Sequence, residues 1–200
     1  MYRVSLIVVL LSCLPSGAFA QCSLASHAPK TAEATLRELQ DPAQADAAGR
    51  RLLEVASKDP RVRDYLDRNL GTLISGCPVG PVWMNAVRLS GELRLGQATP
   101  ALIQVLDRGE IGSGVVTLTT ALRLDDDLVG KALAQIGDPT VPAVARVLKG
   151  APLHLRRRAA LILINIGSPD AKAALTGHLQ REEDPSLRRL ISLGLEKGPF

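Results

Sequence analysis

One pattern occurs almost two times in succession at the C-terminal end of the chain. It consists of apolar runs separated by short segments that contain glycine or proline. An almost wholly apolar run, 159–166, ends at a Gly-Ser-Pro break, and a second run follows with apolar residues at helical spacing. After Asp184-Pro185 the arginine-bearing opening of the first run returns. Glycine is favoured just after a helix and proline in its first turn, so each break predicts a corner between two helices. The sequence therefore predicts repeated helical hairpins.

The run 159–166 also indicates how such hairpins must be arranged. Asn165 is its only polar residue, and a helix that is apolar on all sides must be covered on all sides. One partner helix cannot do this, so neighbouring hairpins must stack on both flanks. Aromatic residues make up only 2% of the chain, which suits closely packed helices and fits poorly with a sandwich or barrel. We expect an all-α fold.

Similar breaks recur upstream of this region. Residues 136–139 read Ile-Gly-Asp-Pro and match the Ile-Gly-Ser-Pro of 166–169, while Asp59-Pro60 parallels Asp184-Pro185. With these motifs the chain resembles the HEAT repeat family, particularly the short HEAT-like repeats also found in phycobilin lyase subunits. The resemblance implies an α-solenoid of HEAT-like helical hairpins.

The predicted organisation has three parts. Residues 1–20 are expected to be a cleaved signal peptide, 21–76 an N-terminal helical cap, and 77–200 the repeat array. The Pro/Gly turn at 77–81 is the expected seam between the cap and the repeats.

The first twenty residues have the composition of a secretory signal. Arg3 supplies the positive start, 4–14 the apolar core, and Ala18 and Ala20 the small residues that favour cleavage after Ala20. The apolar core is too short to span a bilayer. We expect a secreted or periplasmic protein without a transmembrane segment. An alternative is a lipid-anchored envelope protein, because Leu-Leu-Ser before Cys13 loosely matches a lipidation signal.

Cleavage would leave two cysteines, Cys22 and Cys77. In an oxidising compartment two cysteines suggest one disulfide, which would pin the new N-terminus to the Pro/Gly turn. Two unpaired thiols or an intermolecular bridge are the other possibilities.

Motifs of catalysis and of cofactor or metal binding are not found. The three histidines, His27, His154 and His178, occur without a nucleophile elbow, a His-Glu-x-x-His pair or paired cysteines. The glycine-rich stretch 109–114 lacks the Lys-Ser/Thr of a phosphate loop, and the acids at 125–127 are expected to cap a helix. We expect no enzyme, no cofactor and no metal site. The net charge of +4 is too small to indicate nucleic acid binding.

An arginine cluster is the strongest local charge feature. It could form a patch for an acidic partner, phosphate or lipid headgroups, or it could bridge to acids of adjoining repeats such as Asp138, Asp170 and Asp184. The second interpretation is favoured. The cluster comprises Arg156, Arg157, Arg158, Arg188 and Arg189.

The expected function is a non-catalytic scaffold that binds a partner protein, one with an acidic surface. HEAT-like arrays usually present the row of second helices to partners, and periodicity alone gives the outward positions in that row. An enzyme or chromophore-handling factor, by analogy with the bilin lyases, is the alternative. The predicted binding positions are Gln104, Arg108, Arg146, Lys149, Lys172, Thr176 and Gln180.

The signal peptide gives the first testable prediction. The protein purified from the cells that make it should begin at Gln21, as measured by intact mass and N-terminal sequencing. Retention of Met1 would contradict cleavage, and a lipid on Cys13 would favour the envelope-anchored alternative.

Overall fold

The computed structural model describes residues 22–24, 27–108, 124 and 127–198. Three features of the sequence lie outside these ranges. They are the leader at 1–20 with Cys13, the glycine-rich stretch 109–114, and most of the run 115–124, for which the sequence favours an extra short helix.

Within the described ranges the chain forms ten α-helices and no strand, which confirms the all-α prediction. Short 3-10 turns at Gly96–Ala98, Leu106–Arg108 and Asp138–Thr140 join some of them. The helices are α1 (Glu33–Leu39), α2 (Ala45–Lys58), α3 (Pro60–Gly76), α4 (Pro81–Glu92), α5 (Thr99–Gln104), α6 (Leu128–Ile136), α7 (Val141–Gly150), α8 (Leu153–Ile166), α9 (Pro169–Leu179) and α10 (Pro185–Lys197).

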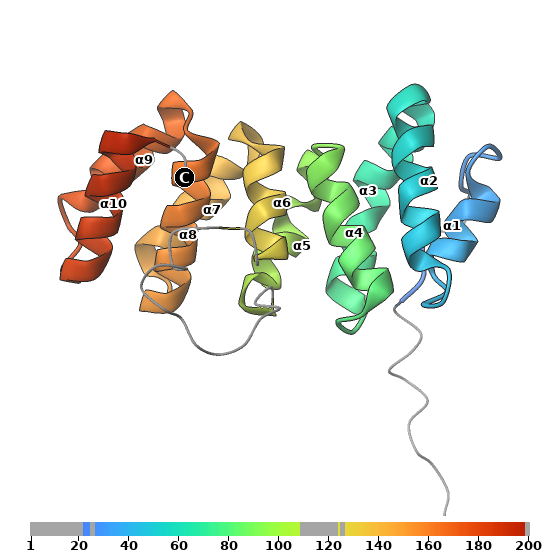
Figure 1. Ribbon diagram of the computed structural model, residues 1–200, viewed down its shortest axis with the longest axis horizontal. Coiled ribbons are helices and arrows are strands. Elements are labelled where there is room, and N and C mark those ends of the chain that lie inside the picture. The colour runs from blue at the N-terminus through green and yellow to red at the C-terminus, as the bar shows by residue number, and fades with distance from the viewer. Residues whose placement is uncertain (1–21, 25–26, 109–123, 125–126, 199–200) are drawn as a thin grey trace, which may run out of the picture.

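The helices are arranged in two layers that follow the order of the sequence (Figure 1). Helices α2, α4, α6, α8 and α10 pack side by side in one layer, which we call the first layer. Helices α3, α5, α7 and α9 pack in the same way in the second layer, and α1 packs against α2 at the N-terminal end. The predicted α-solenoid of helical hairpins is confirmed.

One continuous core of Leu, Ile, Val and Ala runs through the array, from Ala32 to Ile191. Helix α8 lies against α6, α7, α9 and α10, and its residues 159–164 are all buried. The run that the sequence marks as apolar on every side is therefore covered on every side, as predicted. The single tryptophan, Trp83, is fully buried and its Nε1 donates to the carbonyl of Ile74 at 3.0 Å.

The corners between helices lie at the glycine and proline residues where the sequence predicts them. Gly137 and Gly167 follow α6 and α8 with φ of 83° and 65°, the left-handed region in which a side chain would be strained. Pro169 lies in the first turn of α9. The side chain of Asp184 caps α10 by accepting from the N–H of Leu187 at 2.8 Å, and Asp59 caps α3 in the same way.

The parallel between Asp59-Pro60 and Asp184-Pro185 does not extend to the position of their helices. Helix α10 lies in the first layer, but α3 lies in the second, against α5. An Asp-Pro pair supplies a cap and a first-turn proline, and these serve the start of a helix in either layer. The layer is set instead by the packing of α2 against α4.

The disulfide expected from the sequence joins Cys22 to Cys77, with the two Cα atoms 4.8 Å apart. It ties the N-terminal lead-in to the corner between α3, which ends at Gly76, and α4, which begins at Pro81. The bond closes a loop with a sequence separation of 55 residues. A cross-link that closes a loop of this size lowers the conformational entropy of the unfolded chain, which stabilises the fold by about 4 kcal/mol.

Glycines let three pairs of first-layer helices approach closely. Gly49 meets Asn85 where α2 contacts α4, Gly91 meets Ala132 where α4 contacts α6, and a side chain at Gly194 would overlap Ile164 of α8. A Cβ atom at position 91 would lie 2.8 Å from the Cα of Ala132, a distance that forces one helix to move.

We predict that Gly91→Ala lowers the free energy of unfolding by about 1–3 kcal/mol, because the added methyl group strains the contact between α4 and α6. Thermal unfolding followed by circular dichroism measures the change. The matched control is Gly177→Ala in α9, where no atom lies within 4 Å of the added methyl group. That change should stabilise the protein by about 0.5–1 kcal/mol, because alanine favours helix. A gain in stability for both variants would contradict the close packing of α4 and α6.

Candidate functional site

The seven positions that periodicity assigns to partner binding are all exposed in the structure. They lie on or directly after helices α5, α7 and α9, which follow one another in the second layer. We call this surface the outward row. The structure thus brings the seven side chains onto one layer, while their role in binding stays a prediction. The outward row comprises Gln104, Arg108, Arg146, Lys149, Lys172, Thr176 and Gln180.

Three cations of the outward row are exposed and have no ion-pair partner among the described residues. Arg146, Lys149 and Lys172 form no ion pair with another residue of the described ranges. Thr176 is less available, since its hydroxyl donates to the carbonyl of Lys172 at 2.9 Å within the same helix. The positive charge at α7 and α9 is therefore free for an external anion or acidic side chain.

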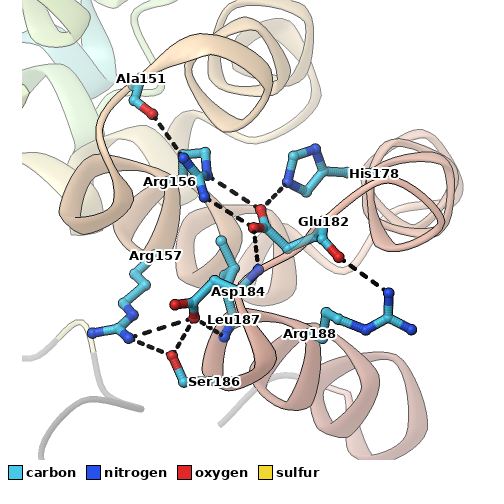
Figure 2. A network of polar contacts seen from close by, with 9 residues as sticks. All are labelled: Ala151, Arg156, Arg157, His178, Glu182, Asp184, Ser186, Leu187 and Arg188. Atoms are coloured by element: carbon cyan, nitrogen blue, oxygen red, sulfur yellow. Dashed lines mark hydrogen bonds and ion pairs between the residues drawn. The ribbon is translucent and has the colours of Figure 1, made fainter.

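The arginine cluster behaves in the opposite way, because most of its charge is used inside the fold. Glu182 lies just after the end of α9. Figure 2 shows its carboxylate between the side chains of Arg156 on α8 and His178 on α9. The guanidinium of Arg156 donates to this carboxylate twice, at 2.9 and 3.2 Å, and the side chain of Glu182 is only 2% exposed. The ring of His178 contacts the same carboxylate at 2.6 Å. The backbone N–H of Asp184 donates to it at 2.9 Å, so one acid joins two helices to the turn before α10.

These contacts decide the ionisation of Glu182. Burial opposes its negative charge, but hydrogen bonds from the N–H of Asp184, from Arg156 and from His178 together lower its pKa from 4.5 to about 2. Glu182 is therefore ionised in the folded protein at neutral pH. A buried carboxylate with this many donors is stable only while its partners stay in place.

Two further arginines of the cluster, Arg157 and Arg188, also have partners. Arg157 donates to Ser186 and lies 3.6 Å from the carboxylate of Asp184 (Figure 2). Arg188 donates to the carbonyl of Glu182 at 3.1 Å. Arg189 is exposed and forms no ion pair within the described ranges.

Arg158 makes the second buried ion pair. Its guanidinium donates to both carboxylate oxygens of Asp127, at 2.8 and 2.5 Å, and its side chain is 8% exposed. Asp127 also caps α6 by accepting from the N–H of Gly130 at 2.8 Å, as the sequence predicts for the acids at 125–127; the other two lie outside the described residues. These contacts agree with the favoured interpretation, in which the arginine cluster bridges to acids of adjoining repeats. We call the contacts of Arg156, Arg157 and Arg158 with these acids the brace.

The sequence identified only some of the brace. Asp184 is a partner, as expected, but Asp138 and Asp170 are not, and Glu182 and Asp127 take their place. No local signal distinguishes these acids, because the contacts span 26 and 31 residues. A weak clue was available in His178, which lies four residues before Glu182 in the sequence.

Metal sites and membrane spans are absent from the part of the chain that the structure describes. Within them, no group of three or more His, Cys, Asp and Glu side chains could hold a metal ion. His154 is exposed, and His178 points to Glu182. In the same ranges, no helix has the length and apolarity needed to cross a bilayer.

We predict that Glu182→Gln lowers the free energy of unfolding at pH 7 by about 3 kcal/mol, because it leaves the half-buried Arg156 without a counter-charge. The effect should depend on pH. Because the folded-state pKa is lowered, ionised Glu182 contributes its full stabilisation above pH 4.5, and this contribution is lost as the pH falls toward 2. Urea unfolding at pH 7 and pH 3 should show the difference from the unmutated protein narrowing at the lower pH.

Glu183→Gln is the matched control. Glu183 is the exposed neighbour, so its loss should change the free energy of unfolding by less than about 0.5 kcal/mol. Equal losses for the two variants, or a loss at Glu182 that does not vary with pH, would contradict the bracing role.

Comparison with known proteins agrees with this geometry. Residues 126–196 match the family model described as HEAT repeats, and this segment contains α6 to α9 and all but the last residue of α10. No curated protein matches the chain. The part of the array from α6 to α10 is therefore similar to HEAT repeats.

Proposed function

We propose that this protein is an exported, non-catalytic HEAT-repeat scaffold that binds a partner protein with an acidic surface through the outward row. The observation that carries the proposal is the contrast between two sets of cations. Arg156 and Arg158 are paired with acids that are mostly buried, whereas Arg146, Lys149 and Lys172 are exposed without internal ion pairs in the described ranges.

The second layer provides a suitable platform for such a surface. Helix α7 packs against both α5 and α9, so the exposed side chains are carried on neighbouring helices with a common buried core. Packed helices lie about 8–10 Å apart, which places cations of successive repeats at a regular spacing. Charges arranged in this way favour encounter with a surface of opposite charge and set its orientation.

The contacts of the acidic residues Glu182 and Asp184 support a structural role for these two side chains. The groups with clearly lowered pKa values include Glu182 and Asp184, and both are bonded to helix starts and arginines within the fold. The buried His178 is likewise bonded to Glu182. These groups are explained by bracing of the array, with no need for a catalytic task.

Two further observations support export. The first twenty residues have the composition of a signal peptide, and a disulfide joins Cys22 to Cys77. Structural disulfides persist in oxidising compartments and are rare where thiols are kept reduced.

The test is affinity capture from the native extracellular or envelope fraction, with the unmutated protein and the variant Arg146→Glu/Lys149→Glu as baits. A partner bound through the outward row should be captured by the unmutated protein and lost with the variant. Its binding should also weaken as salt rises, because exposed charges are screened.

The control bait carries Lys131→Glu, which reverses an exposed charge on α6 in the first layer. Capture of the partner should be unchanged with this bait. A partner that is retained by Arg146→Glu/Lys149→Glu, or lost equally with Lys131→Glu, would place the binding surface elsewhere.

A further inference from the structure

A cavity lies at the N-terminal end of the array, between the segment 27–31 and helix α3. Its volume is about 470 Å³, within the range of sites that hold small molecules. The lining side chains that matter for its chemistry are Pro29, Lys30, Arg61, Asp64, Tyr65 and Arg68. None of them belongs to the outward row or to the brace around Glu182.

The two walls of the cavity are fastened to each other by contacts within the fold. Thr31 donates to the carboxylate of Asp59 at 3.2 Å, which links the segment to the start of α3. Upstream, the N–H of Leu24 donates to the side chain of Gln40 at 3.2 Å, and the disulfide anchors Cys22. His27 adopts φ of 84°, a left-handed conformation that non-glycine residues rarely adopt and that often accompanies binding sites. The cavity is thus preformed.

Its charge is positive. Lys30, Arg61 and Arg68 are exposed and form no ion pair within the described residues, and Arg68 donates only to the backbone carbonyl of Asp64. The carboxylate of Asp59 is already used by the N–H of Arg61 and by Thr31. Among contacts between described residues, Asp64 is then the one acid of the lining without such a bond, against three cations.

The spacing of the cations defines a single face. Arg61 and Arg68 lie seven residues apart on α3, which is close to two helical turns and about 10 Å. Asp64 and Tyr65 lie between them on the same side of the helix.

The rest of the lining is apolar. The side chain of Tyr65 is largely buried, and the ring of Pro29 and the stems of the long cations add further apolar surface. Burial raises the pKa of Tyr65, so its phenol is neutral at physiological pH and does not repel an anion.

We propose that this cavity binds a small organic oxyanion, a carboxylate or phosphate carried on an apolar body. The guanidinium groups of Arg61 and Arg68 and the ammonium of Lys30 would hold the anionic group, since they are suited to oxyanions. The apolar body would lie against Tyr65 and Pro29. This site is separate from the outward row and does not rest on the proposed scaffold function.

Isothermal titration of the full purified chain tests the proposal with four probes: phenyl phosphate, phenylacetate, inorganic phosphate and benzyl alcohol. Phenyl phosphate or phenylacetate should bind more tightly than inorganic phosphate, which lacks the ring, and than benzyl alcohol, which lacks the charge. The stronger of the two aromatic anions identifies the preferred headgroup. Absence of binding by both at millimolar concentration would overturn the proposal.

Charge substitutions then locate the bound probe. Arg61→Gln and Arg68→Gln should each weaken binding by about fivefold or more, because each removes a charged donor. Asp64→Asn should tighten binding, because it removes the opposing negative charge. Arg146→Gln makes the same charge change on α7 and should leave binding unchanged. Equal weakening by Arg146→Gln, or weaker binding with Asp64→Asn, would overturn the proposal. Melting curves of each variant confirm that it is folded.

Discussion

The structure depends on the burial of apolar helix surfaces, and in α8 of a segment that has no polar side. Helix α8 is the clearest case, since every residue from 159 to 164 is buried and four other helices cover it. Burial of each large apolar side chain contributes about 1.5–3 kcal/mol to the stability of the fold. The side chains of α8 are buried only when both neighbouring hairpins are in place. Stability is therefore shared among repeats, and the fold continues in sequence order from one hairpin to the next.

Such close packing requires that any charge inside the array be fully bonded. Glu182 meets this requirement through Arg156, His178 and the N–H of Asp184, and Asp127 meets it through Arg158 and the start of α6. Buried ion pairs of this kind add little net stability, because desolvation offsets their attraction, but breaking one is costly. They fix the contacts of α8 with its neighbours, while the apolar core supplies most of the energy.

The two proposed binding sites use surfaces that lie outside the apolar core. The outward row lies on α5, α7 and α9 or directly follows them, and the proposed oxyanion cavity lies beside α3, which precedes them in the second layer. These helices can be followed in Figure 1. Both surfaces present cations without ion pairs in the described ranges, in contrast to the braced arginines. The disulfide between Cys22 and Cys77 contributes by holding the N-terminal segment close to α3.

Local features of the sequence were enough to predict helical hairpins, several of the corners between helices and the burial of the run 159–166. Glycine at 137 and 167, proline at 169 and the aspartate cap at 184 act over a few residues, so pattern alone places these corners. The exposure of the outward row follows from the same periodicity. Only the tertiary structure decided the layer of α3, the partners of Arg156 and Arg158, and the cavity beside α3. These depend on contacts between residues 26 or more positions apart, which no short-range period encodes.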